Sequence, residues 1–96
     1  MNACKWLSGI KRVRGGKTLK IDLRICGDEV REIVISGDFF AHPEEMVDKL
    51  EDSLRGSKIR DINDILESYR GKILFTGISF DDLVELINRI IWGETR

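Results

Sequence analysis

The feature that most constrains the fold is the stretch KTLKIDLRIC, in which apolar and polar side chains alternate. Its apolar positions are Leu19, Ile21, Leu23 and Ile25. A period of two over this length predicts a β-strand with one buried face and one wet face. A strand covered on both faces would be apolar throughout, so the alternation favours an antiparallel sheet with one face in water.

Turn residues on either side of this strand predict its neighbours. Gly27 and Asp28 supply a turn, after which Val30 to Ser36 reads as a second strand. The pair forms a hairpin. A shorter stretch around Ile10 to Arg14 is expected to add a third strand, joined through Gly15-Gly16.

Two helices are expected between Pro43 and Gly71. Pro43 suits the first position of a helix, and the two glutamates after it complement the helix dipole. Apolar residues then recur with helical spacing as far as Gly56, where the first helix should end. The second helix should begin near Asp61 and carry an apolar stripe to Tyr69.

A third helix has the clearest start signal. Ser79 is the expected N-cap, and Asp82 stands where a capping box places its acid. Ile78 can pack against Leu83 across this start, and Gly93 supplies the stop. Strands first and helices afterwards predict an α+β fold: a small antiparallel sheet of two to three strands with three helices packed on one face.

The length of 96 residues fits a single domain spanning residues 1–96. Such a domain has one small core, which a ligand pocket of about 300–1,000 Å³ would hollow out. The size therefore favours an accessory or binding domain over an enzyme that holds two substrates. A formal net charge of −1 indicates no nucleic-acid partner. No membrane span or signal peptide is recognised, and we expect a cytoplasmic location.

Cys4 and Cys26 are the only cysteines. They provide too few ligands for a zinc or iron–sulfur site, and no C-x-x-C motif is present. We therefore expect no metal site, and we expect both thiols to be reduced.

Basic residues are concentrated in the first 17 residues, and no acid occurs before Asp22. They are Lys5, Lys11, Arg12, Arg14 and Lys17. They form either a solvated basic face or a surface that attracts an anionic group such as a phosphate.

The run Gly16-Lys17-Thr18 matches the end of a phosphate-binding P-loop. The full motif needs a glycine where Lys11 stands and a helix where a strand follows, so a P-loop is not predicted. A weaker hypothesis remains: the glycines permit close backbone approach, and Lys17 brings a point charge to an anion. The alternative is a tight turn followed by an exposed lysine.

The segment ISGDFFAHP holds Gly37, Asp38, Phe39, Phe40 and His42. Adjacent side chains point in different directions, so one ring can enter the core while the other needs separate cover. A partner surface could supply that cover, since aromatic residues anchor interfaces; alternatively, the helices bury both rings. The lone histidine has no second ligand or nucleophile and is not expected to be catalytic.

These motifs occur together in an order that resembles a known family. A Gly-Gly-Lys turn, an alternating strand, a second strand, Gly37-Asp38-Phe39-Phe40 and a Pro-Glu helix start resemble the accessory domain of lipoate–protein ligases. The resemblance runs from about Lys11 to Gly56. In some ligases this domain is the C-terminal part, and in archaeal bipartite ligases it is a separate small subunit, which this chain is similar to in length.

The resemblance implies a fold similar to iron–sulfur assembly scaffolds and a partner, the large catalytic subunit. The complex uses ATP, Mg and lipoate, none bound by this chain alone. It makes lipoyl-adenylate and then transfers the lipoyl group to a lysine of carrier domains in 2-oxo acid dehydrogenases and the glycine cleavage system. The small subunit is needed for adenylation and contributes no catalytic residue.

On this basis we expect the turn residues near the partner's nucleotide and the aromatic segment at the subunit interface or behind the turn. The first set is Gly15, Gly16 and Lys17; the second is Gly37, Asp38, Phe39, Phe40 and His42. Two alternatives stay open. One is a module that positions an acceptor or assembly factor without affecting adenylation, and the other is a metal or iron–sulfur scaffold.

Overall fold

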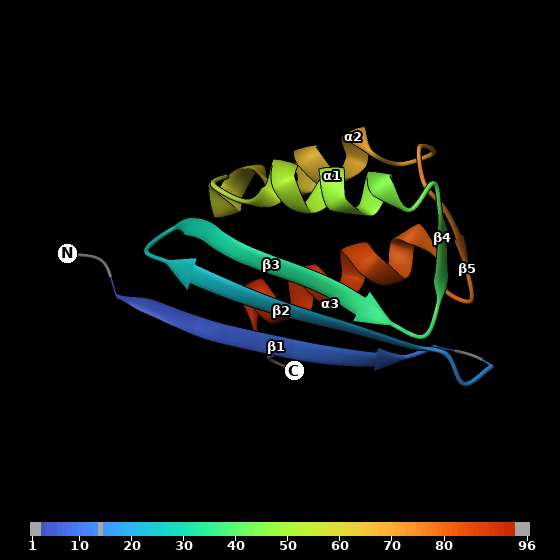
Figure 1. Cartoon of the computed structure of the whole chain (residues 1–96). Coiled ribbons are helices and arrows are strands. Elements are labelled where there is room, and N and C mark those ends of the chain that lie inside the picture. Colours follow the sequence, from blue (N-terminus) through green and yellow to red (C-terminus); the bar gives the residue numbers. More distant parts are fainter. Residues whose placement is uncertain (1–2, 14, 94–96) are drawn as a thin grey trace.

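A computed structural model describes residues 3–13 and 15–93 and shows a sheet with helices over one face (Figure 1). The sheet is antiparallel, with strands β1 (Cys4–Arg12), β2 (Thr18–Cys26) and β3 (Glu29–Gly37) in that spatial order. This arrangement confirms the predicted α+β fold and the hairpin between the second and third strands.

The rest of the chain supplies the covering layer and a second, smaller sheet. Its elements are β4 (Phe40–His42), α1 (Glu45–Leu54), the 3-10 turn η1 (Ile59–Asp61), α2 (Ile62–Ser68), β5 (Leu74–Thr76) and α3 (Phe80–Trp92). Helix α3 packs against β1 and β2, α1 packs against β3, and α2 packs on α1. Strands β4 and β5 pair antiparallel across one end of these layers (Figure 1). Within the described residues, no helix is both long and apolar enough to cross a bilayer.

The core lies between the sheet and the helices. The inward side chains of β2 are its centre: Leu19, Ile21 and Leu23 are at most 1% exposed. They meet buried leucines and isoleucines of the helices, namely Leu50, Leu54, Leu83, Leu86 and Ile87. Burying each such side chain stabilises the fold by about 1.5–3 kcal/mol. The need for apolar side chains on this one face accounts for the alternation in the sequence of β2.

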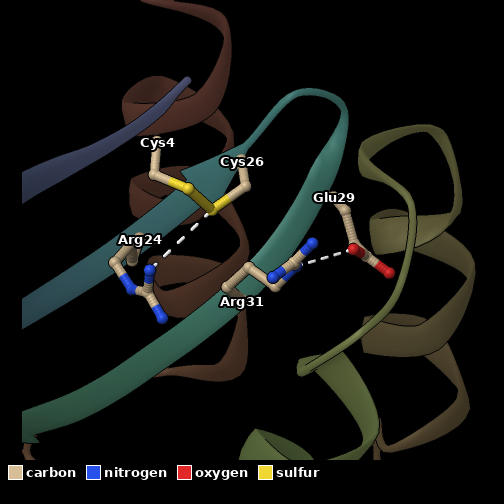
Figure 2. The surroundings of a disulfide bond; sticks show 5 residues. All are labelled: Cys4, Arg24, Cys26, Glu29 and Arg31. Atoms are coloured by element: carbon tan, nitrogen blue, oxygen red, sulfur yellow. Dashed lines mark hydrogen bonds and ion pairs between the residues drawn. A yellow bond between two sulfur atoms is a disulfide. The ribbon is translucent and has the colours of Figure 1, made fainter. Parts of the chain in front are cut away.

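Strand β1 corrects two predictions. It spans Cys4–Arg12 instead of starting near Ile10, and Arg14 lies outside the described residues. Its register places Cys4 opposite Cys26, and the two form a disulfide (Figure 2). The expectation of reduced thiols is therefore wrong. Both errors arise because the inward positions of β1 include Lys5 and Gly9. The strand therefore carries no alternating apolar pattern that would reveal its length.

The helix starts divide into one correct prediction and one error. The Ser79 hydroxyl accepts the Asp82 N–H at 3.1 Å, and the Asp82 carboxylate accepts the Ser79 N–H at 2.8 Å, which confirms the capping box. Pro43 is not helical, because α1 begins at Glu45. Pairing of β4 with β5 keeps the chain extended through His42, immediately before the proline.

Candidate functional site: the turn and the small sheet

The turn between β1 and β2 is closed by its own backbone. The Val13 N–H donates to the Lys17 carbonyl at 2.7 Å, and the Gly16 N–H donates to the Val13 carbonyl at 3.0 Å. Gly15 and Gly16 have φ of +90° and +87°, which glycine adopts most readily. A Cβ at either position would meet nothing within 4 Å, so this backbone is open to an approaching group.

The Gly37-Asp38 segment holds this turn from the side. Asp38 Oδ1 accepts the Thr18 N–H at 2.6 Å, and the Asp38 N–H donates to the Thr18 carbonyl at 3.2 Å. A Cβ on Gly37, whose φ is +151°, would lie 2.2 Å from that same carbonyl. The structure thus brings together two segments singled out in the sequence, with Asp38 fixing the residue that follows Lys17.

Two lysines near this turn have different surroundings. Lys11 is bound by α3: its Nζ lies 2.9 Å from Asp82 Oδ1 and also contacts Glu85. The hydrogen bond to Glu85 raises the pKa of Lys11. Lys17 is half-buried, and a Cβ on Gly77 would lie 3.0 Å from its Cγ, so the stem of this side chain runs along that glycine. Among the described residues, no carboxylate pairs with the Lys17 ammonium group.

The two adjacent phenylalanines divide their roles by direction. Phe39 is half-buried and meets Phe75 of β5 edge-on, with ring centroids 5.7 Å apart. Phe40 is 71% exposed. One ring therefore packs and the other is uncovered, which is the division that adjacent positions in an extended chain impose.

The outward side of β4 and β5 presents further apolar area. Phe40 and His42 alternate with Ala41 on β4, and Leu74, 69% exposed, pairs with His42 from β5. We define the small-sheet surface as Phe40, His42 and Leu74. Sequence patterns do not single out Leu74, because a three-residue strand is too short to show a period; its one signal is a Leu-Phe pair like the earlier Phe-Phe pair.

Aromatic and charged contacts support this end from behind. Phe75 also lies 6.2 Å from Phe80, and the Arg70 guanidinium sits 4.9 Å above the Phe80 ring. Arg70 is in turn paired with Glu67 and Asp81 at 2.7 and 2.8 Å. Beside β4, a shallow depression of about 360 Å³ includes Phe39 and Phe40 in its wall. The small sheet is therefore a supported platform that displays Phe40 outward.

Metal-binding side chains do not gather at this end or elsewhere in residues 3–13 and 15–93. No group of three or more His, Cys, Asp or Glu is placed to share an ion there. Both cysteine sulfurs are joined in the disulfide, with the Arg24 guanidinium 3.9 Å from Cys26 Sγ (Figure 2).

Proteins of one known family match this chain in sequence. The family described as bacterial lipoate protein ligase C-terminus matches residues 8–87, which include the candidate residues of the glycine turn and of the aromatic segment. The chain belongs to this family.

Members of the lipoate protein ligase C-terminus family resemble the chain in sequence and in structure. It is 37% identical over 73 residues to lipoate-protein ligase A subunit 2 of Thermoplasma acidophilum, covering 75% of this chain and 78% of that protein. It also superimposes, with a TM-score of 0.73 and 32% identity, on a chain from the solved structure of a bi-partite lipoate protein ligase and its E2 lipoyl domain from the same organism. That match covers 91% of this chain and 97% of the other.

Proposed function

We propose that this chain is the non-catalytic accessory subunit of a two-part lipoate–protein ligase, required with the large catalytic subunit for lipoyl-AMP formation. Family membership and similarity to a protein named subunit 2 support the accessory role. The observation that carries the finer role is Lys17, positioned beside an exposed apolar platform and without a carboxylate partner in the described residues.

The geometry suits a part that completes a neighbour's site. Lys17 is followed by Thr18, which Asp38 holds through two hydrogen bonds, so the lysine starts from a fixed backbone. Its stem runs along Gly77, the residue after Thr76, and Thr76 pairs with Phe40. A partner that covers Phe40 therefore comes close to Lys17.

In the proposed reaction, the lipoate carboxylate attacks the α-phosphorus of ATP and releases pyrophosphate. Lys17 supplies a positive charge to a phosphate oxygen of the nucleotide held by the large subunit. Docking through the small-sheet surface closes the site and excludes water, which would hydrolyse the mixed anhydride. The carrier lysine then displaces AMP, without a nucleophile from this chain.

Pyrophosphate release from lipoate and ATP tests the role of Lys17. The large subunit is assayed alone, with this chain, and with Lys17→Ala or Lys20→Ala. A charged contact contributes about 1.5–3 kcal/mol, so Lys17→Ala should slow release roughly tenfold or more while the complex still forms. Lys20, exposed on the outer face of β2, is the matched control and should give the wild-type rate. A full rate with Lys17→Ala removes the anion contact.

Affinity for the large subunit tests the small-sheet surface. Phe40→Ala should weaken binding roughly tenfold or more and leave thermal stability nearly unchanged, since an exposed anchor contributes only in the complex. Val34→Ala removes a comparable exposed apolar side chain from β3 and should change neither. If Phe40→Ala lowers the melting temperature without loss of affinity, the ring has a packing role and the platform is not the interface.

The alternative function is a module that positions the acceptor protein. It predicts partner capture with no effect on pyrophosphate release. Assaying adenylation separately from transfer to a lipoyl domain distinguishes the two proposals in one experiment.

A further inference from the structure

The two outer edges of the three-stranded sheet differ in how their backbone groups are paired. On β3, the Ile35 N–H donates to Glu51 Oε2 at 2.8 Å. The Val30 N–H donates to the Ser57 carbonyl at 2.9 Å, and the Val30 carbonyl accepts the Gly56 N–H at 2.6 Å. This edge is covered by helix α1 and the loop that follows it.

The outer edge of β1 is open. Within the described chain, β1 is paired with β2 alone. At its two ends the Gly27 N–H donates to the Ala3 carbonyl and the Val13 N–H donates to the Lys17 carbonyl, so the odd-numbered residues of β1 bond to β2. Because successive residues of a strand direct these groups to opposite sides, the even-numbered residues from Cys4 to Arg12 direct theirs to the open edge.

The side chains of this edge are unusual for a strand left in water. Trp6 and Ile10 lie on the uncovered sheet face and are 60% and 59% exposed. Ser8 stands midway between them, and no charge or proline occurs between Lys5 and Lys11. Edge strands of monomers commonly carry charged residues or proline, because an unprotected edge pairs with other strands.

We propose that β1 pairs with β1 of a second copy of this chain, antiparallel, around a two-fold axis at Ser8. In this register Trp6 of each copy faces Ile10 of the other, a favourable aromatic–β-branched pair. In this register each even-numbered residue faces an even-numbered residue of the second copy, so the backbone groups already directed outward meet one another. The product is a continuous six-stranded sheet across two chains.

The occupant is a second copy because the edge is self-complementary and single. Since β3 is covered, each chain offers one open edge of this sheet, and pairing closes as a dimer instead of extending into a fibre. On the helix side Lys5 faces Lys11 of the second copy, whose ammonium group is already held by Asp82 and Glu85. None of these residues belongs to the small-sheet surface, so the inference does not rest on the proposed function.

Sedimentation equilibrium of the whole chain, whose mass is 11.0 kDa, measures the pairing directly. We expect the mass of a dimer, and we expect Ser8→Pro to raise the dimer dissociation constant roughly tenfold or more. The Ser8 N–H points away from β2, so this proline spares the β1–β2 ladder; circular dichroism checks that the variant is folded. Ile10→Thr gives a second weakening variant that keeps β propensity, and Val34→Thr on β3 is its control.

Cross-linking fixes the register. Residues in a hydrogen-bonded antiparallel pair have Cα atoms about 5.5 Å apart, within the range of a disulfide. Ser8→Cys should therefore form a covalent dimer under oxidation, and Ser36→Cys, exposed on β3, should not. A monomer up to about 0.5 mM, or a dimer indifferent to Ser8→Pro and Ile10→Thr, overturns the proposal. So does a monomer whose binding to the large subunit is weakened by Ser8→Pro, because the edge then belongs to that partner.

Discussion

The two ends of the β1–β2 hairpin are held by different kinds of contact. One end is joined covalently by Cys4 and Cys26, and the Cys26 side chain is 1% exposed. The other end is a turn with two glycines at positive φ, held by Asp38 through hydrogen bonds. The residues proposed for anion contact and docking gather at the second end. The hairpin thus separates an end that is fixed by a covalent bond from an open end that can present groups to a partner.

Because of this contrast, stability should depend on both ends of the strand pair, and the proposed function should depend on the turn end. Loss of the disulfide should affect unfolding without touching the small-sheet surface. Loss of the contacts around Asp38 should affect both, because they position Lys17 as well as closing the turn. Variants at the two ends can therefore separate effects on stability from effects on activity.

The largest effect is expected from Gly37→Ala. The new Cβ would lie 2.2 Å from the Thr18 carbonyl at a φ of +151°, so the backbone at the open end must move. We expect a loss of at least about 3 kcal/mol in the free energy of unfolding, measured with urea. Gly16→Ala is the control: its φ is +87° with open space around it, and it should lose about 1 kcal/mol. Equal losses would mean that close approach to Thr18 does not hold the turn.

Cys4→Ala tests the closed end. A disulfide that joins residues 22 positions apart stabilises a fold by about 2–3 kcal/mol, mainly by restricting the unfolded chain. Thermal unfolding should show this loss in the variant, and adding reductant should then change nothing further. Pyrophosphate release with the large subunit should stay at the wild-type rate. A slower rate in a folded Cys4→Ala chain would show that the two ends are coupled.

Asp38→Ala tests whether the turn contacts position Lys17. Removing the acceptor of the Thr18 N–H should lower stability by about 1 kcal/mol, less than either change above. It should also slow pyrophosphate release, because the lysine loses its fixed starting point. Asp38→Asn keeps an oxygen acceptor and should restore most of both. If the alanine variant loses stability alone, Asp38 has no part in placing Lys17.

The same contrast explains which parts of the fold the sequence predicts. Strand β2 is buried on one face along its whole length, so Leu19 to Ile25 show the period of two clearly. Strand β1 lies at the edge. There Gly9 leaves room for the Ile90 side chain of α3, and an acid of that helix pairs with the Lys11 ammonium group. Its inward positions therefore show no apolar period, and its length was underestimated.

The missed disulfide follows from that underestimate. Once β1 is extended back from the pair Arg12–Thr18, each step pairs one earlier residue with one later residue and ends at Cys4 opposite Cys26. The small sheet is different in kind. Strands of three residues are determined by pairing between Ala41 and Phe75, far apart in sequence, which no local pattern predicts. The motif Gly37-Asp38 could be recognised, but its contact with Thr18 required the fold.

The smallest effect concerns the lysines that flank the open end. The hydrogen bond from Lys11 lowers the pKa of Glu85 below its ordinary 4.5. Burial would raise the pKa of Asp82, but bonds from Lys11 and Ser79 outweigh it and lower this pKa as well. A carboxyl whose pKa is lowered by folding stabilises the fold above its unfolded pKa, and this stabilisation is lost as pH falls through the folded pKa. Between about pH 5 and about pH 3, the free energy of unfolding should therefore fall further in the wild type than in Lys11→Met. The difference between the two falls should be less than about 1 kcal/mol. Lys17→Met, which removes no ion pair of the described residues, should keep the wild-type pH dependence while slowing pyrophosphate release. If Lys17→Met changes the pH dependence and Lys11→Met does not, the open end is held by the charge of Lys17. The proposed contact of Lys17 with nucleotide would then fail.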